Sequence, residues 1–189
     1  AVGDAMYRHS KKPKYVETVP FGAFKRELLA LIGFYNETLL SNEDYEFNTR
    51  IRKAGGRIWL DPSIRSIYFA RPTLQELARQ YWRYGYWKWH MLRRYPDTLR
   101  WRQALPPLFV LSLLSLTIIS TVTPIARFLL AGVLLLYIMV MFFAGARSAI
   151  GQGKPYLIFG LPLAIPVMHI SWGSGFLWSI LNSGKSRNG

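Results

Sequence analysis

Hydrophobic positions follow three different patterns along the chain. Up to about residue 72, short apolar runs alternate with polar residues, Gly and Pro, which is typical of strands and short helices in a water-exposed domain. From Thr73 to about residue 104, apolar positions recur every three or four residues, as on one face of a helix. Beyond residue 105, long apolar runs follow one another. The pattern therefore predicts three regions, residues 1–72, 73–104 and 105–189.

The first region predicts an α/β arrangement of short elements. YVETVPFGAF alternates as a strand around Tyr15 to Val19 and is broken at Pro20 and Gly22. FKRELLALIGF is a short helix that ends at Gly33. A second helix starts at Ser41 or Asn42, ends at Gly55–Gly56, and is followed by a strand in RIWLDP; SIRSIYF is a possible extended piece.

That second helix carries a predicted capping box and one apolar face. Ser41 and Asn42 are both good N-cap residues, and Asp44 follows Ser41 by three positions. Phe47, Ile51 and Ala54 would share one face of the helix at i, i+4 and i+7.

The second region predicts an amphipathic helix in TLQELARQYWRYGYWKWHMLRRYPDTLRW. Its apolar stripe consists of Leu74, Leu77, Ala78, Tyr81, Gly85, Trp89 and Leu92. Its cationic face consists of Arg79, Arg83, His90 and Arg94. Such a helix suits a membrane interface, where the cations face headgroups or a phosphate and the aromatic rings lie at intermediate depth. The alternative is an ordinary surface helix with solvated arginines.

The third region predicts helices that cross a membrane. Gln103 to Ala126 and Phe128 to Ala146 carry no charge, and at about 1.5 Å per residue each can cross a hydrocarbon core of about 30 Å. The expected spans are 105–123 and 128–146, with Pro124 in the turn between them. The segment 156–181 is interrupted by Pro and Gly, so it is either a third, kinked span or a helix followed by a re-entrant or interfacial segment.

Charge separates the two halves of the chain. The formal net charge is +14, yet all 10 acidic residues lie before residue 103, and only five Lys and Arg residues follow it. A basic region beside apolar spans is what the positive-inside rule and anionic headgroups select, so we expect membrane lipids rather than nucleic acid as partners. The first half, Arg147 and Lys154 are assigned to the cytoplasmic side of a multi-pass protein. Cysteine is absent, which excludes disulfides.

Three carboxylates in NEDYEF admit three interpretations. Glu43, Asp44 and Glu46 could complement the positive end of a helix dipole, each contributing about 0.3–1 kcal/mol. They could bind a divalent metal, given further ligands, because hard cations take clustered carboxylates. One of them could act as a general base at a helix start. The basic neighbours Arg50, Arg52 and Arg83 would favour its charged form.

An ordered set of motifs resembles the C-terminal half of inverting family 2 glycosyltransferases with a GT-A fold, especially the membrane enzymes of bacterial exopolysaccharide assembly, succinoglycan type. The set is VPFGAFKRELL, IGFYNE, NEDYEFNTRIRKAGGRIWLDP and RQYWRYG, and the resemblance runs from about Val2 to Pro106. It implies that Asp44 is the catalytic base. Gln80, Arg83 and Tyr84 match the family's Gln-x-x-Arg-Trp motif, with Tyr in place of Trp.

The resemblance also implies the reaction and its partners. An acceptor hydroxyl would attack the anomeric carbon of a nucleotide sugar, and the acceptor would be a lipid-linked molecule or a polysaccharide at the cytoplasmic face of the inner (plasma) membrane. Residues implied in donor or acceptor binding are Glu43, Gln80, Arg83, Tyr84, Glu17, Thr18 and Gly22. A divalent Mg or Mn ion is expected in the complete enzyme, with its ligands mostly upstream and none in this fragment.

Two further expectations concern the status of the chain. Because the nucleotide-binding strands and the Asp-x-Asp motif of the family would precede Ala1, we expect a fragment that is inactive alone. The competing hypothesis is a non-enzymatic membrane protein that binds anionic lipid through its basic aromatic helix. An RNA-binding module is disfavoured by the apolar spans.

Overall fold

The computed structural model describes residues 10–19, 22–65, 67 and 69–183. Strands β1 (Lys14–Val16) and β2 (Ile58–Leu60) pair antiparallel, with Tyr15 opposite Trp59. Helix α1 (Arg26–Ile32) ends at Gly33, whose φ of 77° suits a residue without a Cβ. Helix α2 (Glu43–Lys53) packs Phe47 and Ile51 on Ile58, whereas Ala54, predicted on the same face, is exposed at the helix end.

The predicted capping box at the start of α2 is wrong. The N-cap is Asn42 rather than Ser41, and its backbone is left-handed, with a φ of 66° and no side-chain capping bond. The carboxylate of Asp44 instead accepts a hydrogen bond from the adjacent backbone amide of Tyr45. The side-chain amide of Asn42 donates to the backbone carbonyl of Tyr84 on α3 rather than capping α2.

The α/β domain predicted for residues 1–72 is not confirmed, because the described part contains two strands of three residues each. No further strand is found in the described residues of SIRSIYF; Ser66 and Tyr68 lie outside the description, as do Pro20 and Phe21 at the predicted strand break. The pairing of residues near 15 and near 59 does follow the predicted strands.

Four longer helices make up the rest. Helix α3 (Leu74–Arg94) begins at Thr73, whose hydroxyl accepts a hydrogen bond from the amide of Glu76 at 3.2 Å. The short 3-10 helix η2 (Pro96–Thr98) leads into α4 (Trp101–Ser120), α5 (Pro124–Gln152) and α6 (Leu157–Asn182). Pro124 is the first residue of α5 rather than part of the turn, a position that suits its fixed φ and missing N–H.

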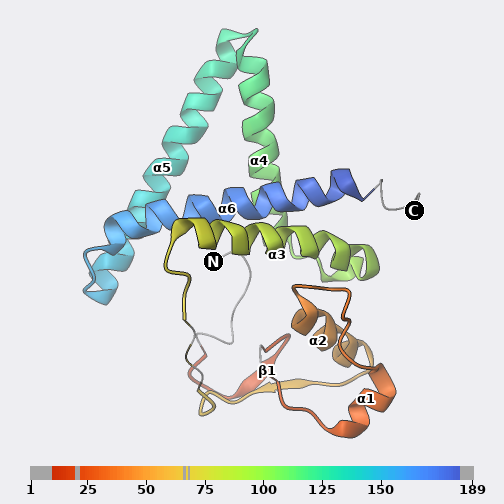
Figure 1. The fold of residues 1–189 in the computed structure, drawn as a ribbon. Coiled ribbons are helices and arrows are strands. Elements are labelled where there is room, and N and C mark those ends of the chain that lie inside the picture. The colour runs from red at the N-terminus through yellow and green to blue at the C-terminus, as the bar shows by residue number, and fades with distance from the viewer. Residues whose placement is uncertain (1–9, 20–21, 66, 68, 184–189) are drawn as a thin grey trace.

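The helices form three layers (Figure 1). α3 and α6 lie side by side, α4 and α5 rise from them as a hairpin, and α1, α2 and the strand pair lie on the opposite side. All of α4, α5 and α6 are long and apolar enough to cross a membrane. However, α6 is one continuous helix that runs crosswise to α4 and α5.

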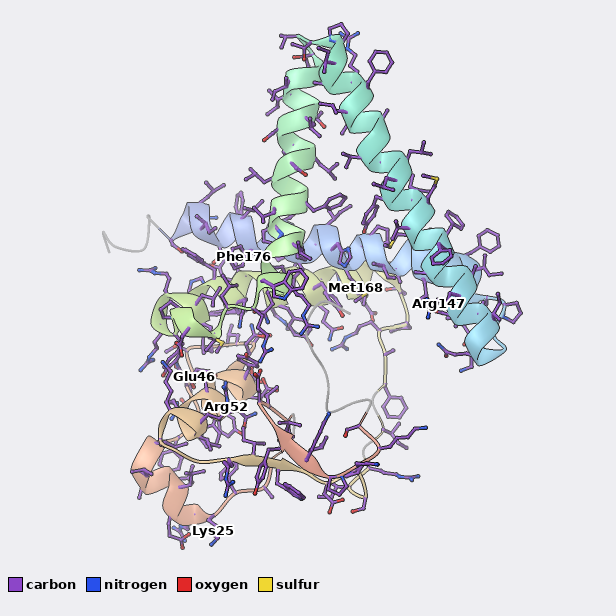
Figure 2. The ribbon with its side chains drawn as sticks, turned by 180° about the vertical axis from the view of Figure 1, so that it is seen from behind. Lys25, Glu46, Arg52, Arg147, Met168 and Phe176 are labelled. Carbon is purple, nitrogen blue, oxygen red and sulfur yellow. The ribbon has the colours of Figure 1, made fainter. Side chains whose placement is uncertain are left out.

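The apolar stripe of α3 faces α6 rather than open lipid. Leu92 of α3 forms a buried cluster with Trp172 and Phe176 of α6 (Figure 2 labels Phe176). Trp89 donates a hydrogen bond from its indole to the hydroxyl of Ser183 at 2.8 Å. His90, predicted on the cationic face, lies 3.1 Å from the Ser179 hydroxyl through Nδ1. Helix α3 therefore has a protein partner on its apolar side.

Glycines let α3 and α6 approach at backbone distance. A Cβ built on Gly85 would lie 2.0 Å from the carbonyl oxygen of Trp172, and one on Gly175 would lie 2.3 Å from the carbonyl oxygen of Trp82. Because the obstructing atoms belong to the backbone, a side chain at either glycine would push the helices apart.

Gly85→Ala is expected to lower the free energy of unfolding by about 1–3 kcal/mol, because it overpacks this seam. Gly132→Ala on α5 is the matched control, since a Cβ there meets nothing within 4 Å. The control should be neutral or more stable by up to about 1 kcal/mol, since Ala is the better helix former. Thermal midpoints in detergent compare the two; equal midpoints would contradict the close packing of α3 and α6.

Candidate active site

The three carboxylates at the start of α2 have three different environments. Glu43 is exposed, Asp44 is half-buried, and Glu46 has a relative exposure of only 1%. A shared role as helix-dipole partners would leave all three near solvent, so the structure separates them into one surface acid, one partly desolvated acid and one internal acid.

Asp44 lies in the first turn of α2 with a pKa raised from its ordinary value. Burial of the carboxylate is the main cause, and the neighbouring negative charge of Glu43 adds to it. The amide of Tyr45, which donates to Oδ1 at 2.7 Å, partly opposes the increase. The expectation that basic neighbours would hold Asp44 in its charged form is wrong, because burial prevails. A raised pKa makes this carboxylate a stronger proton acceptor when it is ionised.

Glu46 joins three elements from inside the protein. Nε of Arg50 donates to both carboxylate oxygens, at 3.0 and 3.1 Å, and the phenol of Tyr95 donates to Oε1 at 2.9 Å. The same guanidinium donates to backbone carbonyls at the end of α1, those of Ile32 and Phe34. Glu46 therefore ties α1 and the residue after α3 to α2 (Figure 2), and this role explains one of the three clustered acids.

Asn42 brings the start of α2 to the middle of α3. Its Nδ2 donates to the backbone carbonyl of Tyr84 at 3.3 Å, across 42 positions of sequence. Gln80, which is buried, donates from Nε2 to the phenol of Tyr84 at 2.6 Å, one helical turn along α3. The turn that carries Asp44 and the predicted Gln-x-x-Arg-Tyr motif are thus neighbours in space.

Two of the predicted motif residues differ in what they can contact. Arg83 is exposed and follows Gln80 by three positions, while Gln80 is buried and orients Tyr84. Arg79, on the cationic face predicted for this helix, is also exposed. Of these side chains Arg83 and Arg79 are open to an anionic ligand, and a direct ligand contact by Gln80 would compete with its bond to Tyr84.

The three predicted residues at and after β1, Glu17, Thr18 and Gly22, have different surroundings. Asn48, one turn after Asp44, donates to the hydroxyl of Thr18 at 2.8 Å and to the carbonyl of Val19 at 3.0 Å, so Thr18 is held against α2. Glu17 instead pairs with Arg100 just before α4. Gly22 is exposed in the following loop. Thr18 is therefore placed close to the face of α2 that carries Asp44, whereas Glu17 has a structural partner.

Tyr35 is a neighbour of Asp44 that the sequence did not single out. Its ring stacks on Phe47, with centroids 4.4 Å apart. Burial raises the pKa of its phenol, and the charges of Asp44 and Glu43 raise it further, which places this phenol near both carboxylates. Its position in IGFYNE, ahead of the acidic cluster, was the available signal, but no spacing rule connects a loop residue with the next helix.

Lys88 is a buried cation between α2 and α3. It has a relative exposure of 4%, and its Nζ lies 4.4 Å from the centroid of the Tyr45 ring. Nζ also donates a weak hydrogen bond of 3.9 Å to the sulfur of Met91. Burial lowers the pKa of Lys88 to about 8, and the charge of Arg52 contributes. Within the described part of the chain, Nε of Arg52 is itself buried without a hydrogen-bond partner. This cation contact holds Tyr45, the residue after Asp44, against α3.

Lys88→Met is expected to raise stability at neutral pH and to change its pH dependence. Because the folded protein holds the proton less tightly than the unfolded chain, the free energy of unfolding should rise as pH increases from about 8 to 10.5. The substitution removes this rise. Lys25→Met, at an exposed position before α1, should keep it. Denaturation midpoints across this pH range give the comparison, and an unchanged slope in Lys88→Met would contradict the buried charge.

The divalent metal expected for the complete enzyme stays a prediction, because its ligands are expected mostly upstream. Among the described residues, no group of three or more His, Asp or Glu side chains is arranged to hold a metal ion.

Comparisons with known proteins give the following similarities. The chain is 28% identical over 184 residues to succinoglycan biosynthesis protein ExoA of Rhizobium meliloti, covering 95% of this chain and 53% of that protein. It is 23% identical over 185 residues to a dolichyl N-acetyl-alpha-D-glucosaminyl phosphate 3-beta-D-2,3-diacetamido-2,3-dideoxy-beta-D-glucuronosyltransferase of Methanococcus voltae, covering 97% of this chain and 53% of that protein. The chain thus spans about half the length of these curated relatives. No protein-family model and no solved structure matches it.

Proposed function

We propose that this chain is the acceptor-side half of a membrane-attached, inverting glycosyltransferase of family 2 that transfers a sugar from a nucleotide donor to a lipid-linked or polysaccharide acceptor. The observation that carries the proposal is the half-buried Asp44 carboxylate, with its raised pKa, held beside the Gln80–Tyr84 segment by Asn42. Similarity along nearly the whole chain to a named glucuronosyltransferase supports the same class of reaction.

The proposed chemistry requires one base and one stabiliser of negative charge. The oxygen of the acceptor hydroxyl attacks the anomeric carbon from the face opposite the leaving diphosphate. As it attacks, Asp44 takes the proton of that hydroxyl. The bond from that carbon to the diphosphate oxygen breaks, so the configuration inverts. Arg83, exposed on α3 next to Tyr84, is available to stabilise the negative charge of the leaving diphosphate or of a phosphate group on the acceptor. Asp44 acts as the base in its ionised form, and its partial burial raises its pKa, which makes the ionised carboxylate a stronger proton acceptor.

The arrangement of helices supports a specific attachment to the membrane. We propose that α4 and α5 cross as a hairpin, because they carry exposed apolar side chains such as Ile118 and Phe128 and rise away from the polar domain. The crosswise α6 then lies in the interface with α3 as one continuous helix, which differs from both alternatives expected for residues 156–181, a kinked span and a helix followed by a re-entrant or interfacial segment. Arg147 lies near the α5–α6 turn on the side of α3 (Figure 2), which we assign to the cytoplasm of the inner membrane.

Arg83→Lys is expected to reduce transfer by the full-length protein by about tenfold, although the charge is kept, because the planar guanidinium binds phosphate oxygens through a fork that an ammonium lacks. Arg65→Lys, at an exposed position after β2, is the matched control and should keep the parental rate. Initial rates of transfer to the lipid fraction measure both. Equal rates for the two variants would remove Arg83 from the site.

The test of the proposed function is an assay of the full-length protein in membranes with a panel of labelled nucleotide sugars. Label that enters the lipid or polymer fraction, in proportion to the amount of this protein, is the expected result. Vesicles that bind the protein but incorporate no sugar from any donor would instead favour the non-enzymatic lipid-binding hypothesis.

A further inference from the structure

Tyr35 lies in the loop between α1 and α2, and both of its sequence neighbours are held in place. The guanidinium of Arg50 donates to the backbone carbonyl of Phe34 at 2.7 Å. On the other side, Oδ1 of Asn36 accepts hydrogen bonds from the backbone amide and the hydroxyl of Thr38, at 3.1 and 2.7 Å. The loop therefore presents Tyr35 from a fixed position.

The ring of Tyr35 lies over the first turn of α2. It stacks on Phe47, with centroids 4.4 Å apart and ring planes 13° apart, and Phe47 is only 1% exposed. Helical side chains lean towards the helix N-terminus, and residues three and four apart share a face, so the Phe47 ring lies beside Asp44 and Glu43. The charges of the same two acids raise the pKa of the Tyr35 phenol, which agrees with this placement. At neutral pH the phenol is therefore a neutral donor next to the proposed base.

Packing accounts for the ring of Tyr35 but not for its hydroxyl. Phenylalanine would stack on Phe47 equally well. Among the described residues, no hydrogen-bond partner of the hydroxyl is found, and its pKa is shifted by burial and by the two acids alone. The residue is also 41% exposed. A donor without a protein partner, on a fixed support beside a carboxylate, is suited to bind an oxygen atom of a ligand.

The geometry of an inverting transfer indicates which ligand this is. The base and the leaving diphosphate lie on opposite faces of the anomeric carbon, so a group beside Asp44 faces the acceptor. We infer that Tyr35 binds the acceptor: its phenol donates a hydrogen bond to an acceptor oxygen next to the attacking hydroxyl and so orients that hydroxyl towards Asp44. This inference rests on the proposed function and adds an acceptor-binding residue to it.

Tyr35→Phe tests the inference, because it removes the hydroxyl and keeps the ring. With the full-length protein in membranes that supply the acceptor, the rate of transfer at saturating donor should fall by about tenfold, the size expected for one lost hydrogen bond. KM for the donor should stay parental. The thermal midpoint should also stay parental, since the hydroxyl has no partner in the described part of the chain. Tyr156→Phe, at the exposed N-cap of α6, is the matched control and should keep the parental rate.

A second measurement needs no transfer activity. With 3-fluorotyrosine incorporated, fluorine NMR follows the ionisation of Tyr35 in detergent, and the signal is assigned by its loss in Tyr35→Phe. Asp44→Asn should lower the pKa of this phenol, because it removes a negative charge that opposes ionisation. The other charged groups of α2 near the phenol, Glu43 and Arg50, are unchanged in this variant. Asp97→Asn, which removes an acid that does not act on Tyr35, should leave the pKa where it was.

Transfer by Tyr35→Phe at the parental rate would overturn the inference, as would an unchanged phenol pKa in Asp44→Asn. A lower rate that merely accompanies a lower thermal midpoint would make the hydroxyl structural. A higher KM for the donor at unchanged kcat would place the phenol on the donor, which also contradicts the inference. If the parental protein transfers no sugar, the proposed function fails and the inference fails with it. If the parental protein is active and Tyr35→Phe equals it, the inference alone fails.

Discussion

Asp44→Asn is expected to lower sugar transfer by the full-length protein by about 10²–10⁴-fold, the usual contribution of a general base. Asparagine keeps the size of the side chain and an oxygen that can accept from the amide of Tyr45, but it cannot take a proton. Donor binding should survive, so the loss should appear in kcat. Initial rates over a range of donor concentrations separate kcat from KM.

The same substitution should preserve or raise stability. The folded-state pKa of Asp44 is raised, so the folded protein binds the proton more tightly than the unfolded chain, and stability falls as pH rises through the range between the two pKa values. At neutral pH the ionised carboxylate therefore lowers the free energy of unfolding, and asparagine removes this effect. A control is Glu27→Gln, which alters an exposed acid in the first turn of α1. If activity and thermal midpoint fall together in Asp44→Asn, as for a misfolded protein, Asp44 is structural.

Glu46→Gln is expected to have the largest effect on stability, about 3–5 kcal/mol, because it removes the buried carboxylate of an ion pair and leaves the Arg50 side chain, only 17% exposed, without its counter-charge. It also weakens the links from α2 to Tyr95 and, through Arg50, to the end of α1. Denaturant midpoints in detergent measure the loss, and transfer measured well below the new midpoint should be much less affected than in Asp44→Asn.

Asp97→Asn is the matched control for Glu46. Asp97 pairs with Lys53 at 3.0 Å, but both side chains are about half-exposed, so the pair should contribute much less to the free energy of unfolding than the internal Glu46–Arg50 pair. If Glu46→Gln costs no more than Asp97→Asn, the internal network around Glu46 does not hold these elements together.

Periodicity predicted the elements of this protein better than it predicted their partners. The stripe through Gly85 and Trp89 correctly indicated the helix Leu74–Arg94, because a period of 3.6 residues is a local property. It could not show that α6 covers the stripe, since that contact joins positions about 90 residues apart. The same limit applies to α6, whose length and composition match a span while its packing places it crosswise.

The candidate site was predicted unevenly for a similar reason. The motif order indicated Asp44 and the Gln80–Tyr84 segment, and the structure places the two beside each other. Nothing in the local pattern distinguished Glu46 from its acidic neighbours, because its burial depends on Arg50 and on Tyr95, 49 positions away. Burial likewise raises the pKa of Asp44, opposite to the expected direction. Desolvation depends on the folded surroundings of the carboxylate rather than on its neighbours in the sequence.

The anomeric configuration of the product tests the central claim most directly. The full-length protein is incubated with the nucleotide sugar that it uses, and the new glycosidic bond is assigned by proton NMR. A single displacement assisted by one base, Asp44, predicts a configuration opposite to that of the donor. Retention of the donor configuration, or inversion at an undiminished rate in Asp44→Asn, would contradict the account.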